Sequence, residues 1–557
     1  MGTVAIRRGF TQPARYAVLL AGGLPALAFP APNLEFLAWF GLVPGLLLIR
    51  AAPTQREAAV RGWWFGTGYL LAALYWLVPN LGPALLLVAI VLGALWIAVG
   101  LAAWRLLRAP VTARRALAAL AVVPSCWLAG EWIRSWQGIG GPWAVFGASQ
   151  WQHPSVLALA AVGGIWLVTV ALASANTGIV IALVAGRAPV RLLGAAAAAV
   201  AIAAGPAAFA GTAPAPTVRH ITIALVQPGT TDGVAARAAA DERLTATTRA
   251  RGADLIVWGE SSVGFDLRRD TKLLRRLRRL SASVGAQLLV NEDALNARGA
   301  KAKTATLIGP DGIAGTYVKT RLVPFGEYIP LRAELGWLDK ISRAAPQNVV
   351  AGTGARVLHA TLRNGRPLTI GVLICFESAF PDMSRVDADH GAQVIIYQTS
   401  DSTFQGSWAL AQHASLSAVR AAETGRPVVQ AALTGDSAAF DARGRLLGWA
   451  RSSDRGALTV SLSLPAASAR TPYDRLGDYV PWSATAVAVL AAAIALISAA
   501  RVRQHESRPD RRAGIPLKRS HRPGRSARAA DGAQPRAPAG RSADPGTDAA
   551  HVRREEP

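Results

Sequence analysis

The feature that most constrains this chain is a series of long apolar runs in its first 211 residues. A helix that crosses a bilayer needs about 20 predominantly apolar residues. Runs of this kind lie near 14–30, 35–52, 60–80, 83–106, 115–136, 160–186 and 189–211, and one more lies near 480–500. A second run follows the first at once, which argues against a cleaved signal peptide. The pattern predicts a polytopic α-helical membrane domain with about eight spans.

Basic residues alternate between the loops that join these runs. Arginines cluster before the first run and after the second, fourth and sixth: Arg7, Arg8, Arg15, Arg50, Arg56, Arg61, Arg105, Arg108, Arg114, Arg115, Arg187 and Arg191. The loops around 30–34 and 80–83 contain neither Lys nor Arg. By the positive-inside rule, the N-terminus is therefore predicted to be cytoplasmic and residues 212–478 extracytoplasmic.

The composition divides the chain into four parts. Residues 1–211 form the predicted N-terminal membrane domain with about seven spans, residues 212–478 resemble a soluble domain, and residues 479–500 form the last span. The Arg- and Pro-rich residues 501–557 are predicted to be a disordered cytoplasmic tail. The net charge of +25 raises the question of nucleic-acid binding. No aromatic-basic recognition motif accompanies that charge, so no nucleic-acid partner is expected.

From residue 219 the pattern changes to short apolar strands that alternate with helices. Strands are predicted at 221–226, 254–258, 287–290, 305–308, 368–375, 393–397, 428–432 and 437–440. Helices are predicted around 242–250, 273–284 and 409–422. This alternation is typical of α/β layers around a buried sheet, and reactive side chains in such folds lie just past strand ends.

Three reactive residues follow predicted strands or a strand-like run in the order Glu260, Lys319, Cys375, with Lys319 at the end of the run GTYVK (315–319). Each has an ordinary explanation when taken singly: a solvated carboxylate, a surface lysine and a buried free cysteine. Together they form a catalytic set. A carboxylate acts as general base, an ammonium lowers a thiol pKa and stabilises an oxyanion, and a thiolate attacks carbonyl carbon. The other cysteine, Cys126, lies in an apolar run, so a structural disulfide is not expected.

The sequence around these residues resembles the apolipoprotein N-acyltransferase family, a membrane-embedded branch of the nitrilase superfamily. The resemblance covers roughly residues 14–500. It rests on LIVWGES (255–261), YVKTRLVPFGEYIP (317–330), ICFES (374–378), RAAETGRPVVQAALTG (420–435) and YDRLGDYVPW (473–482). It implies an αββα nitrilase-like sandwich for the extracytoplasmic α/β domain, and a location in the bacterial inner or plasma membrane.

The resemblance also implies an activity. An acyl chain passes from a phospholipid of the phosphatidylethanolamine type to a thioester on Cys375. It then passes to the N-terminal amine of a diacylglyceryl-cysteine lipoprotein. Cys375 corresponds to the nucleophile, Glu260 to the general base and Lys319 to the oxyanion stabiliser, while Glu327 and Glu377 correspond to supporting acids. Neither a metal ion nor an organic cofactor is expected.

Several neighbouring residues are expected to support the site or contact substrate: Trp258, Phe325, Tyr328, Phe376, Ser400 and Asp401. The apolar residues Leu335, Trp337 and Leu338, with Phe325, either admit acyl chains or belong to the core. The sequence departs from the family in three places. Phe376 lies where the family usually has Tyr. The loop at residues 226–237 lacks the Trp-containing motif that family members usually carry. Residues 398–406 read QTSDSTFQG where the family usually has an Asn-Asp-x-Trp-Phe-Gly motif. These departures bear on substrate choice or the second half-reaction.

Other interpretations stay open at this point. A membrane-bound nitrilase-type amidase acting on a small amide would use the same three residues, although a tether needs only one or two spans. A non-catalytic paralogue is a second alternative, against which the intact catalytic set argues. Catalysis by Cys375 with His413 is a third, but His413 lies in a predicted helix and is expected to be a packing residue. Glu131 and Arg134 are expected to form an i,i+3 pair that snorkels at the membrane interface.

Overall fold

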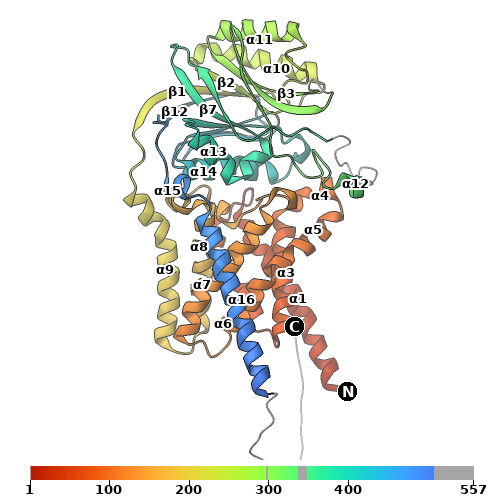
Figure 1. The fold of residues 1–557 in the computed structure, drawn as a ribbon, viewed down its shortest axis with the longest axis vertical. Helices are drawn as coiled ribbons and strands as arrows, with labels where there is room; N and C mark the ends of the chain where they lie inside the picture. The colour runs from red at the N-terminus through yellow and green to blue at the C-terminus, as the bar shows by residue number, and fades with distance from the viewer. Residues whose placement is uncertain (1, 296–298, 337–347, 507–557) are drawn as a thin grey trace, which may run out of the picture. The chain divides into compact units, whose positions relative to one another are not determined.

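The computed structural model describes residues 2–295, 299–336 and 348–506 (Figure 1). Residues Met1–Leu496 form one compact unit, in which an α/β sandwich is carried on a bundle of helices. Ile497–Pro557 form a second unit, of which only the end of helix α16 (Tyr479–Glu506) is described. The last helix thus continues past residue 500, and most of the predicted tail lies outside the described residues.

The N-terminal part consists of helices joined by short 3₁₀ turns. Its helices are α1 (Gly2–Gly23), α2 (Val43–Arg50), α3 (Gln55–Ala73), α4 (Val78–Leu81), α5 (Ala84–Gly93), α6 (Ile97–Leu107), α7 (Ala113–Arg134), α8 (Pro154–Val184) and α9 (Ala188–Gly211). Five helical stretches among the described residues are long and apolar enough to cross a membrane: Ala84–Leu107, Ala113–Arg134, Pro154–Val184, Ala188–Gly211 and Tyr479–Arg501. They agree with five of the eight predicted spans.

Two of the other three predicted spans, at 35–52 and 14–30, have a different local structure. The run at 35–52 contains a 3₁₀ turn (Glu35–Trp39) followed by the 8-residue helix α2, which begins with a proline at its first positions. The run at 14–30 is the second half of α1 followed by a 3₁₀ turn (Leu24–Ala28) whose second residue is proline. Proline lacks the N–H that a helix interior needs, so these runs are interrupted. The count of eight spans remains a prediction.

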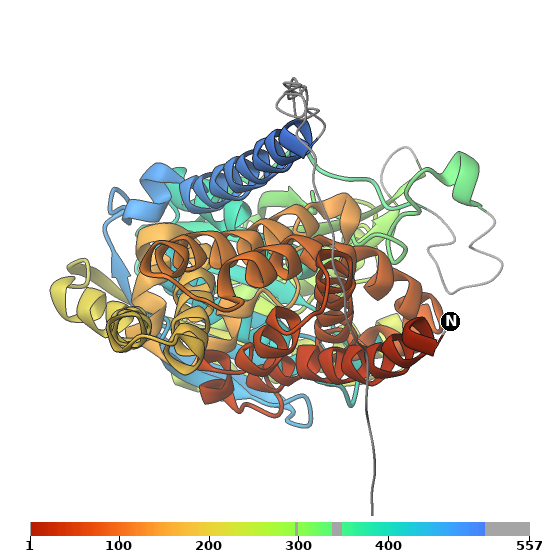
Figure 2. The same ribbon diagram turned by 90° about the horizontal axis from the view of Figure 1, so that it is seen from below.

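Burial differs sharply between the candidate spans. In Pro154–Val184, 72% of the apolar window is buried inside the protein, whereas in Tyr479–Arg501 the value is 6%. Seen from below, α16 runs along the outer edge of the bundle (Figure 2). Helix α16 is apolar on all sides, and the rest of the protein leaves most of its surface exposed, so lipid can cover this surface.

Helix α8 is broken near its start by two glycines. Gly163 has φ −134° and ψ 24°, and Gly164 has φ 69° and ψ −177°, so the regular helix begins at Ile165. A Cβ atom on Gly164 would lie 2.7 Å from the ring of Tyr473. The break therefore lets the chain of the bundle approach a residue of the sandwich closely.

Glu131 and Arg134 are buried, so the prediction of a snorkelling interfacial pair is wrong. Glu131 Oε1 accepts a hydrogen bond from the N–H of Phe146 at 2.9 Å, and Arg134 donates to the carbonyl of Ala144 at 2.8 Å. The charges are retained inside because the chain itself supplies their partners. The pair thereby fastens the Gly- and Trp-rich loop that follows α7.

The remaining part is a sandwich of two 6-stranded sheets, with strand orders β12-β1-β2-β3-β4-β5 and β11-β10-β9-β8-β7-β6. The first sheet contains β1 (Thr217–Gln227), β2 (Leu255–Trp258), β3 (Gln287–Leu295), β4 (Lys301–Gly309), β5 (Gly312–Val318) and β12 (Gly456–Pro465). The second contains β6 (Val357–Thr361), β7 (Pro367–Ile374), β8 (Val394–Thr399), β9 (Val428–Ala432), β10 (Ser437–Phe440) and β11 (Leu446–Ala450). The core between the sheets is made by the inward side chains of these strands.

Helices cover both outer faces of the sandwich (Figure 1). The first sheet is covered by α10 (Val234–Thr247) and α11 (Thr271–Val284), and the second by α13 (Pro381–Asp389) and α14 (Ala409–Thr424). Short helices α12 (Arg332–Leu335) and α15 (Pro472–Leu476) lie in connections. The predicted αββα layering is confirmed, and α13 and α14 form the layer that faces the bundle.

Candidate active site

The three predicted catalytic residues each follow a strand. Glu260 comes two residues after β2, Lys319 directly follows β5, and Cys375 directly follows β7. Lys319 Nζ lies 3.2 Å from Glu260 Oε1, and the charges of both groups act on the pKa of the Cys375 thiol. The structure therefore brings the ends of strands from both sheets to one place.

Lys319 is fully buried and held by two carboxylates. Its Nζ lies 2.7 Å from Glu327 Oε1 in addition to its contact with Glu260. The other oxygen of Glu327 accepts the N–H of Val323 at 2.9 Å. Burial lowers the pKa of Lys319, but the two carboxylates outweigh burial and raise that pKa well above its usual value. The ammonium is therefore a permanent, fixed positive charge.

Glu260 is buried next to two ammonium groups. Burial raises the pKa of Glu260, but the charges of Lys303 and Lys319 outweigh burial and lower it to about 2. The carboxylate is therefore ionised at neutral pH, the state in which it can accept a proton.

Cys375 occupies a strained turn. It has φ 52°, in the left-handed region that non-glycine residues rarely adopt, and it begins the 3₁₀ turn Cys375–Ala379. Strain of this kind at a strand end is typical of nucleophiles presented on sharp turns. Burial and the charge of Glu260 raise the pKa of the thiol well above its usual value, although Lys319 opposes them. The resting sulfur is thus a thiol, which needs a base to react.

Glu377 joins the nucleophile turn to the loop after β5. Its carboxylate accepts the N–H of Ile374 at 2.7 Å, the N–H groups of Thr320 at 2.7 Å and Arg321 at 2.9 Å, and the hydroxyl of Tyr317 at 2.7 Å. These bonds come from both sheets. The predicted supporting acid therefore fixes the nucleophile turn beside the lysine loop.

Comparison with known proteins decides which family this arrangement belongs to. The family models described as apolipoprotein N-acyltransferase N-terminal domain and carbon-nitrogen hydrolase match residues 21–178 and 222–470. A relative named apolipoprotein N-acyltransferase from Rhodopseudomonas palustris is 30% identical over 83% of this chain and 91% of its own length. Another of that name, from Allorhizobium ampelinum, is 31% identical over 79% of this chain and 86% of its own length. The chain belongs to the apolipoprotein N-acyltransferase family.

The chain is also similar to a further relative of the apolipoprotein N-acyltransferase family and to a solved structure. A relative of the same name from Geobacter metallireducens is 29% identical over 86% of this chain and 94% of its own length. A solved amidase from Nesterenkonia sp. covers 46% of this chain and 95% of its own, with 20% identity and a TM-score of 0.33. The assignment rests on the family models and on the relatives matched over most of their length.

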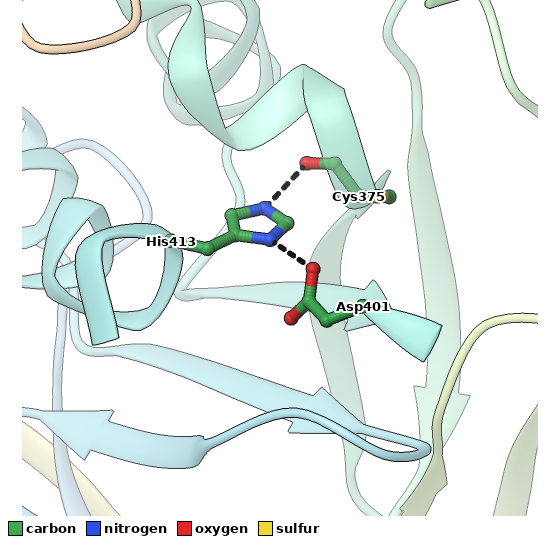
Figure 3. A group of neighbouring side chains, drawn as sticks. All are labelled: Cys375, Asp401 and His413. Atoms are coloured by element: carbon green, nitrogen blue, oxygen red, sulfur yellow. Dashed lines mark hydrogen bonds and ion pairs between the residues drawn. The ribbon is translucent and has the colours of Figure 1, made fainter. Parts of the chain in front are cut away.

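In this member of the apolipoprotein N-acyltransferase family, His413 lies directly behind the nucleophile turn (Figure 3). Its Nδ1 lies 2.8 Å from Asp401 Oδ1, and its Nε2 lies 3.1 Å from the carbonyl oxygen of Cys375 and 2.9 Å from Ser378 Oγ. Burial lowers the pKa of His413, but Asp401 outweighs burial and raises it. Because both ring nitrogens face acceptors, the geometry suits a doubly protonated imidazolium.

The expectation that His413 only packs in its helix is therefore wrong. Its sequence signal is the polar pair Gln412-His413 in the first two turns of a helix whose neighbouring residues there are small or apolar. The donor atoms of Cys375, Asp401 and His413 lie within 4.8 Å of one another, as they would around a metal ion. Both imidazole nitrogens are engaged by oxygens, so hydrogen bonding alone accounts for this group.

Lys303, on β4, is a site residue that the sequence reasoning missed. Its Nζ lies 3.1 Å from Glu260 Oε1, 2.9 Å from Ser261 Oγ and 3.7 Å from Asp293 Oδ2. The only local signal is the word KAK at 301–303, in which two lysines point to the same side of a strand.

The remaining predicted contacts have mixed positions. Trp258 is fully buried, and its Nε1 donates to Thr245 Oγ1 of α10 at 2.8 Å; its contact with substrate stays a prediction. The alternation of a strand turns its ring into the core under α10 and α11. Phe325 and Tyr328 close the tight turn that presents Glu327, with the Phe325 N–H donating to the Tyr328 carbonyl at 2.6 Å.

Two further predictions concern residues near the turn after β8. Asp401 orients His413, as described above. Ser400 Oγ donates to Ser402 Oγ at 3.3 Å, and the backbone carbonyl of Ser400 accepts a hydrogen bond from the hydroxyl of Thr434. Trp337 and Leu338, and the side chain of Leu335, lie outside the described residues.

The helical bundle contributes an aromatic wall beside the nucleophile. The ring of Trp143 lies 6.2 Å from that of Phe376, nearly parallel to it at 27°, and 5.3 Å from the ring of His413. Trp76 packs edge-on to Trp143 at 5.3 Å and to Phe404 at 5.0 Å. Phe376 thus packs against the bundle, and the membrane part helps to enclose the site.

Proposed function

We propose that the chain moves an acyl chain from a phospholipid, through a thioester on Cys375, to the N-terminal amine of a diacylglyceryl-cysteine lipoprotein. The chain is an N-acyltransferase of the nitrilase superfamily that acylates lipoproteins, by its family and by relatives matched over most of their length. The phosphatidylethanolamine-type donor and the residue roles form the finer part of the proposal. The observation that carries them is the ion pair of Lys319 with Glu260 next to the strained Cys375.

In the first half-reaction, Glu260 takes the proton of the Cys375 thiol as the sulfur attacks the sn-1 ester carbonyl. The oxyanion that forms is stabilised by the fixed ammonium of Lys319. The ester C–O bond then breaks, and Glu260 returns the proton to the departing glycerol oxygen. A lysophospholipid leaves, and the acyl chain stays on sulfur as a thioester.

In the second half-reaction, the unprotonated amine of the lipoprotein attacks the thioester carbonyl. Glu260 takes a proton from the attacking nitrogen, and Lys319 again stabilises the oxyanion. The C–S bond breaks as the amide forms, and Glu260 returns the proton to the sulfur of Cys375. The enzyme is thereby restored.

The pKa shifts of Glu260 and Cys375 explain why the Cys375 thiol keeps its proton in the absence of substrate. The pKa of Glu260 is about 2, whereas burial and the charge of Glu260 raise the pKa of the Cys375 thiol. Proton transfer between them is therefore unfavourable in the resting site. It proceeds when attack on a carbonyl consumes the thiolate, which also protects the sulfur from adventitious reaction.

The alternating arginines support the proposed topology. We place residues 212–478 on the extracytoplasmic side of a bacterial inner or plasma membrane, and the N-terminus and basic tail in the cytoplasm. In this arrangement the sandwich face covered by α13 and α14 meets the outer leaflet. Both lipid substrates then reach Cys375 without leaving the membrane surface.

The test is intact mass spectrometry of the detergent-purified protein incubated with phosphatidylethanolamine and no acceptor. We expect a mass gain of one acyl chain that hydroxylamine removes and that Cys375→Ala lacks. Elution of Cys375→Ala as a folded species in size-exclusion chromatography serves as the control. A wild-type protein that gains no acyl chain from common phospholipids, or a Cys375→Ala variant that still gains one, contradicts the proposal.

A further inference from the structure

Glu260 lies between two lysines, and the catalytic scheme uses only one of them. Lys319 Nζ lies 3.2 Å from Glu260 Oε1, and Lys303 Nζ lies 3.1 Å from the same oxygen. The side chain of Lys303 is only 13% exposed. Burying a second ammonium is costly unless its partners are fixed, so its position requires an explanation.

Lys303 has three partners of its own. Its Nζ accepts no bond and has three protons to donate, and these face Glu260, Ser261 Oγ at 2.9 Å and Asp293 Oδ2 at 3.7 Å. Lys319, by contrast, contacts Glu327 in addition to Glu260. Each lysine is therefore anchored by a different acid, and the two approach the general base from different strands.

We propose that Lys303 is a positioning residue for the general base: it pins Oε1 of Glu260 together with Lys319 and leaves Oε2 to exchange the proton with sulfur. This inference rests on the proposed function, because it assigns a proton-transfer role to Glu260. A carboxylate pinned at one oxygen by one ammonium rotates more freely than one pinned by two.

Removal of the Lys303 charge is expected to have a measurable effect on the pKa of Glu260. The titratable groups that surround Glu260 and Lys303 are Lys319, Glu327, Cys375, Asp293 and His413. Burial raises the pKa of Glu260, and Lys303 and Lys319 together lower it to about 2. Removal of the Lys303 charge leaves burial opposed by Lys319 alone, so the pKa of Glu260 rises. The base is then lost to protonation at a higher pH than in the wild-type protein.

Lys301 supplies a matched control on the same strand. It lies two positions before Lys303 and has the same charge, and its Nζ lies 3.3 Å from Asp293 Oδ1. Its side chain is 43% exposed, and its ion pair is with Asp293 and not with Glu260. Substitution of Lys301 removes one positive charge from β4 without removing a contact of the general base.

The experiment compares acyl transfer from phosphatidylethanolamine to a diacylglyceryl-cysteine lipopeptide over a range of pH. The full-length wild-type protein is compared with Lys303→Met, Lys303→Gln, Lys303→Arg and Lys301→Met. We expect the acid limb of kcat/KM to lie at higher pH in both neutral Lys303 variants than in the wild-type protein. Lys303→Arg restores the wild-type limb, and Lys301→Met follows the wild-type profile.

The outcomes separate the inference from the function on which it rests. An active wild-type protein whose pH profile is shared by folded Lys303→Met and Lys303→Gln overturns the inference alone. An equal shift in Lys301→Met also overturns it, because charge on the strand would then suffice. A wild-type protein without acyl transfer contradicts the proposed function. Lys303→Gln, which keeps a donor for Ser261 and Asp293, guards against loss of folding in Lys303→Met.

Discussion

The carboxylate of Glu423 accepts a hydrogen bond from the backbone N–H of Ile165 at 2.7 Å, although 258 residues separate the two in the sequence. Glu423 ends the sandwich helix α14, and Ile165 begins the regular part of the bundle helix α8. The glycine break before Ile165 frees this N–H, as happens at the start of any helix. A sandwich side chain thus caps a candidate membrane span.

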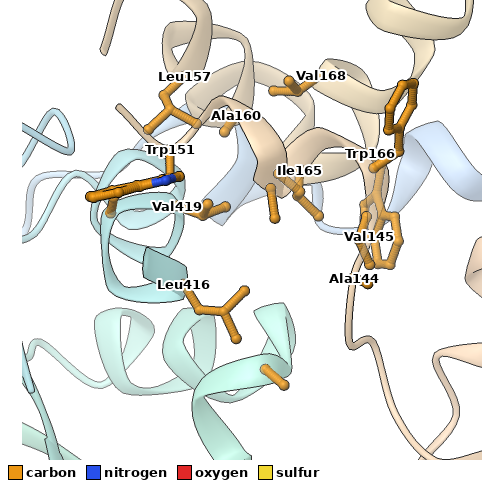
Figure 4. Close-up of a cluster of buried hydrophobic side chains, with 14 of the residues drawn as sticks. Ala144, Val145, Trp151, Leu157, Ala160, Ile165, Trp166, Val168, Leu416 and Val419 are labelled. Atoms are coloured by element: carbon orange, nitrogen blue, oxygen red, sulfur yellow. The ribbon is translucent and has the colours of Figure 1, made fainter. Parts of the chain in front are cut away.

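The same helix α14 reaches the nucleophile. Leu416 and Val419 pack against Leu157, Ala160 and Ile165 in the buried cluster between the two parts (Figure 4). Helix α14 therefore contacts the bundle through Leu416 and Val419, while its His413 contacts the carbonyl of Cys375. The active site and the membrane part are joined through one rigid element.

We expect Glu423→Ala to destabilise the protein by about 1–3 kcal/mol, because it leaves the buried Ile165 N–H without its acceptor. Glu423→Gln keeps an amide oxygen in place and is expected to lose less. Thermal unfolding in detergent, followed by circular dichroism, measures both. Equal unfolding temperatures for Glu423→Ala and the wild-type protein would show that this cap contributes nothing.

We expect His413→Asn to lower both stability and kcat, with KM for the phospholipid little changed, because His413 holds the nucleophile turn and does not bind lipid. The pKa of His413 is raised in the folded protein, since Asp401 outweighs burial. The stabilisation is thus fully present below the usual histidine pKa of about 6.5 and is lost as pH rises through the raised pKa.

The measurement for His413 is the unfolding temperature of both proteins over a pH series. The gap between wild-type and His413→Asn should be widest at low pH and should close as pH rises. A gap that is independent of pH would contradict the imidazolium assignment.

We expect Glu377→Ala to reduce kcat strongly and to cost several hydrogen bonds, because one carboxylate serves donors from the loops of both sheets. Loss of this bridge lets Cys375 drift from Lys319, so the thioester should form slowly even at saturating phospholipid. Single-turnover acylation of Cys375 measures this step. Asp389→Asn, at an acid that is 40% exposed on α13, is the control and should acylate normally.

We expect Gly164→Ala to destabilise the junction between α8 and the sandwich. The new Cβ would lie 2.7 Å from the ring of Tyr473, at a φ of 69° that non-glycine residues adopt only with strain. Gly186→Ala is the matched control, since no heavy atom lies within 4 Å of its Cβ position. The two unfolding temperatures should differ by several degrees, and a Gly164→Ala value equal to that of Gly186→Ala would contradict the close approach.

We expect Glu260→Gln to lower the rate of acyl transfer by about 10²–10⁴-fold while the protein remains folded in the membrane, because the amide cannot take the thiol proton. Glu242→Gln, at an acid on α10 paired with Arg276, is the control and should retain activity. Release of lysophospholipid by each variant measures the effect. Near-normal release by Glu260→Gln would assign the base to another group.

Local pattern determined much of this protein. Run length separates the membrane helices from the sandwich, and short apolar runs of strand type precede Glu260, Lys319 and Cys375. Strands β9 and β10 have the predicted bounds, because turn residues on both sides of these short apolar runs mark where each strand begins and ends. The four edge strands β5, β6, β11 and β12 were absent from the predicted strands, since partly exposed edge strands show weaker apolar signals.

The tertiary structure decided the rest, because it concerns contacts between residues far apart in the sequence. Which lysines reach Glu260, which carboxylate turns His413 toward Cys375 and which acid caps Ile165 depend on how the sheets and α14 pack. The pKa values depend on the same packing, since burial and neighbouring charges act only in the folded chain. The sequence by itself determined which residue types the site contains, and only the fold determined which of them face one another.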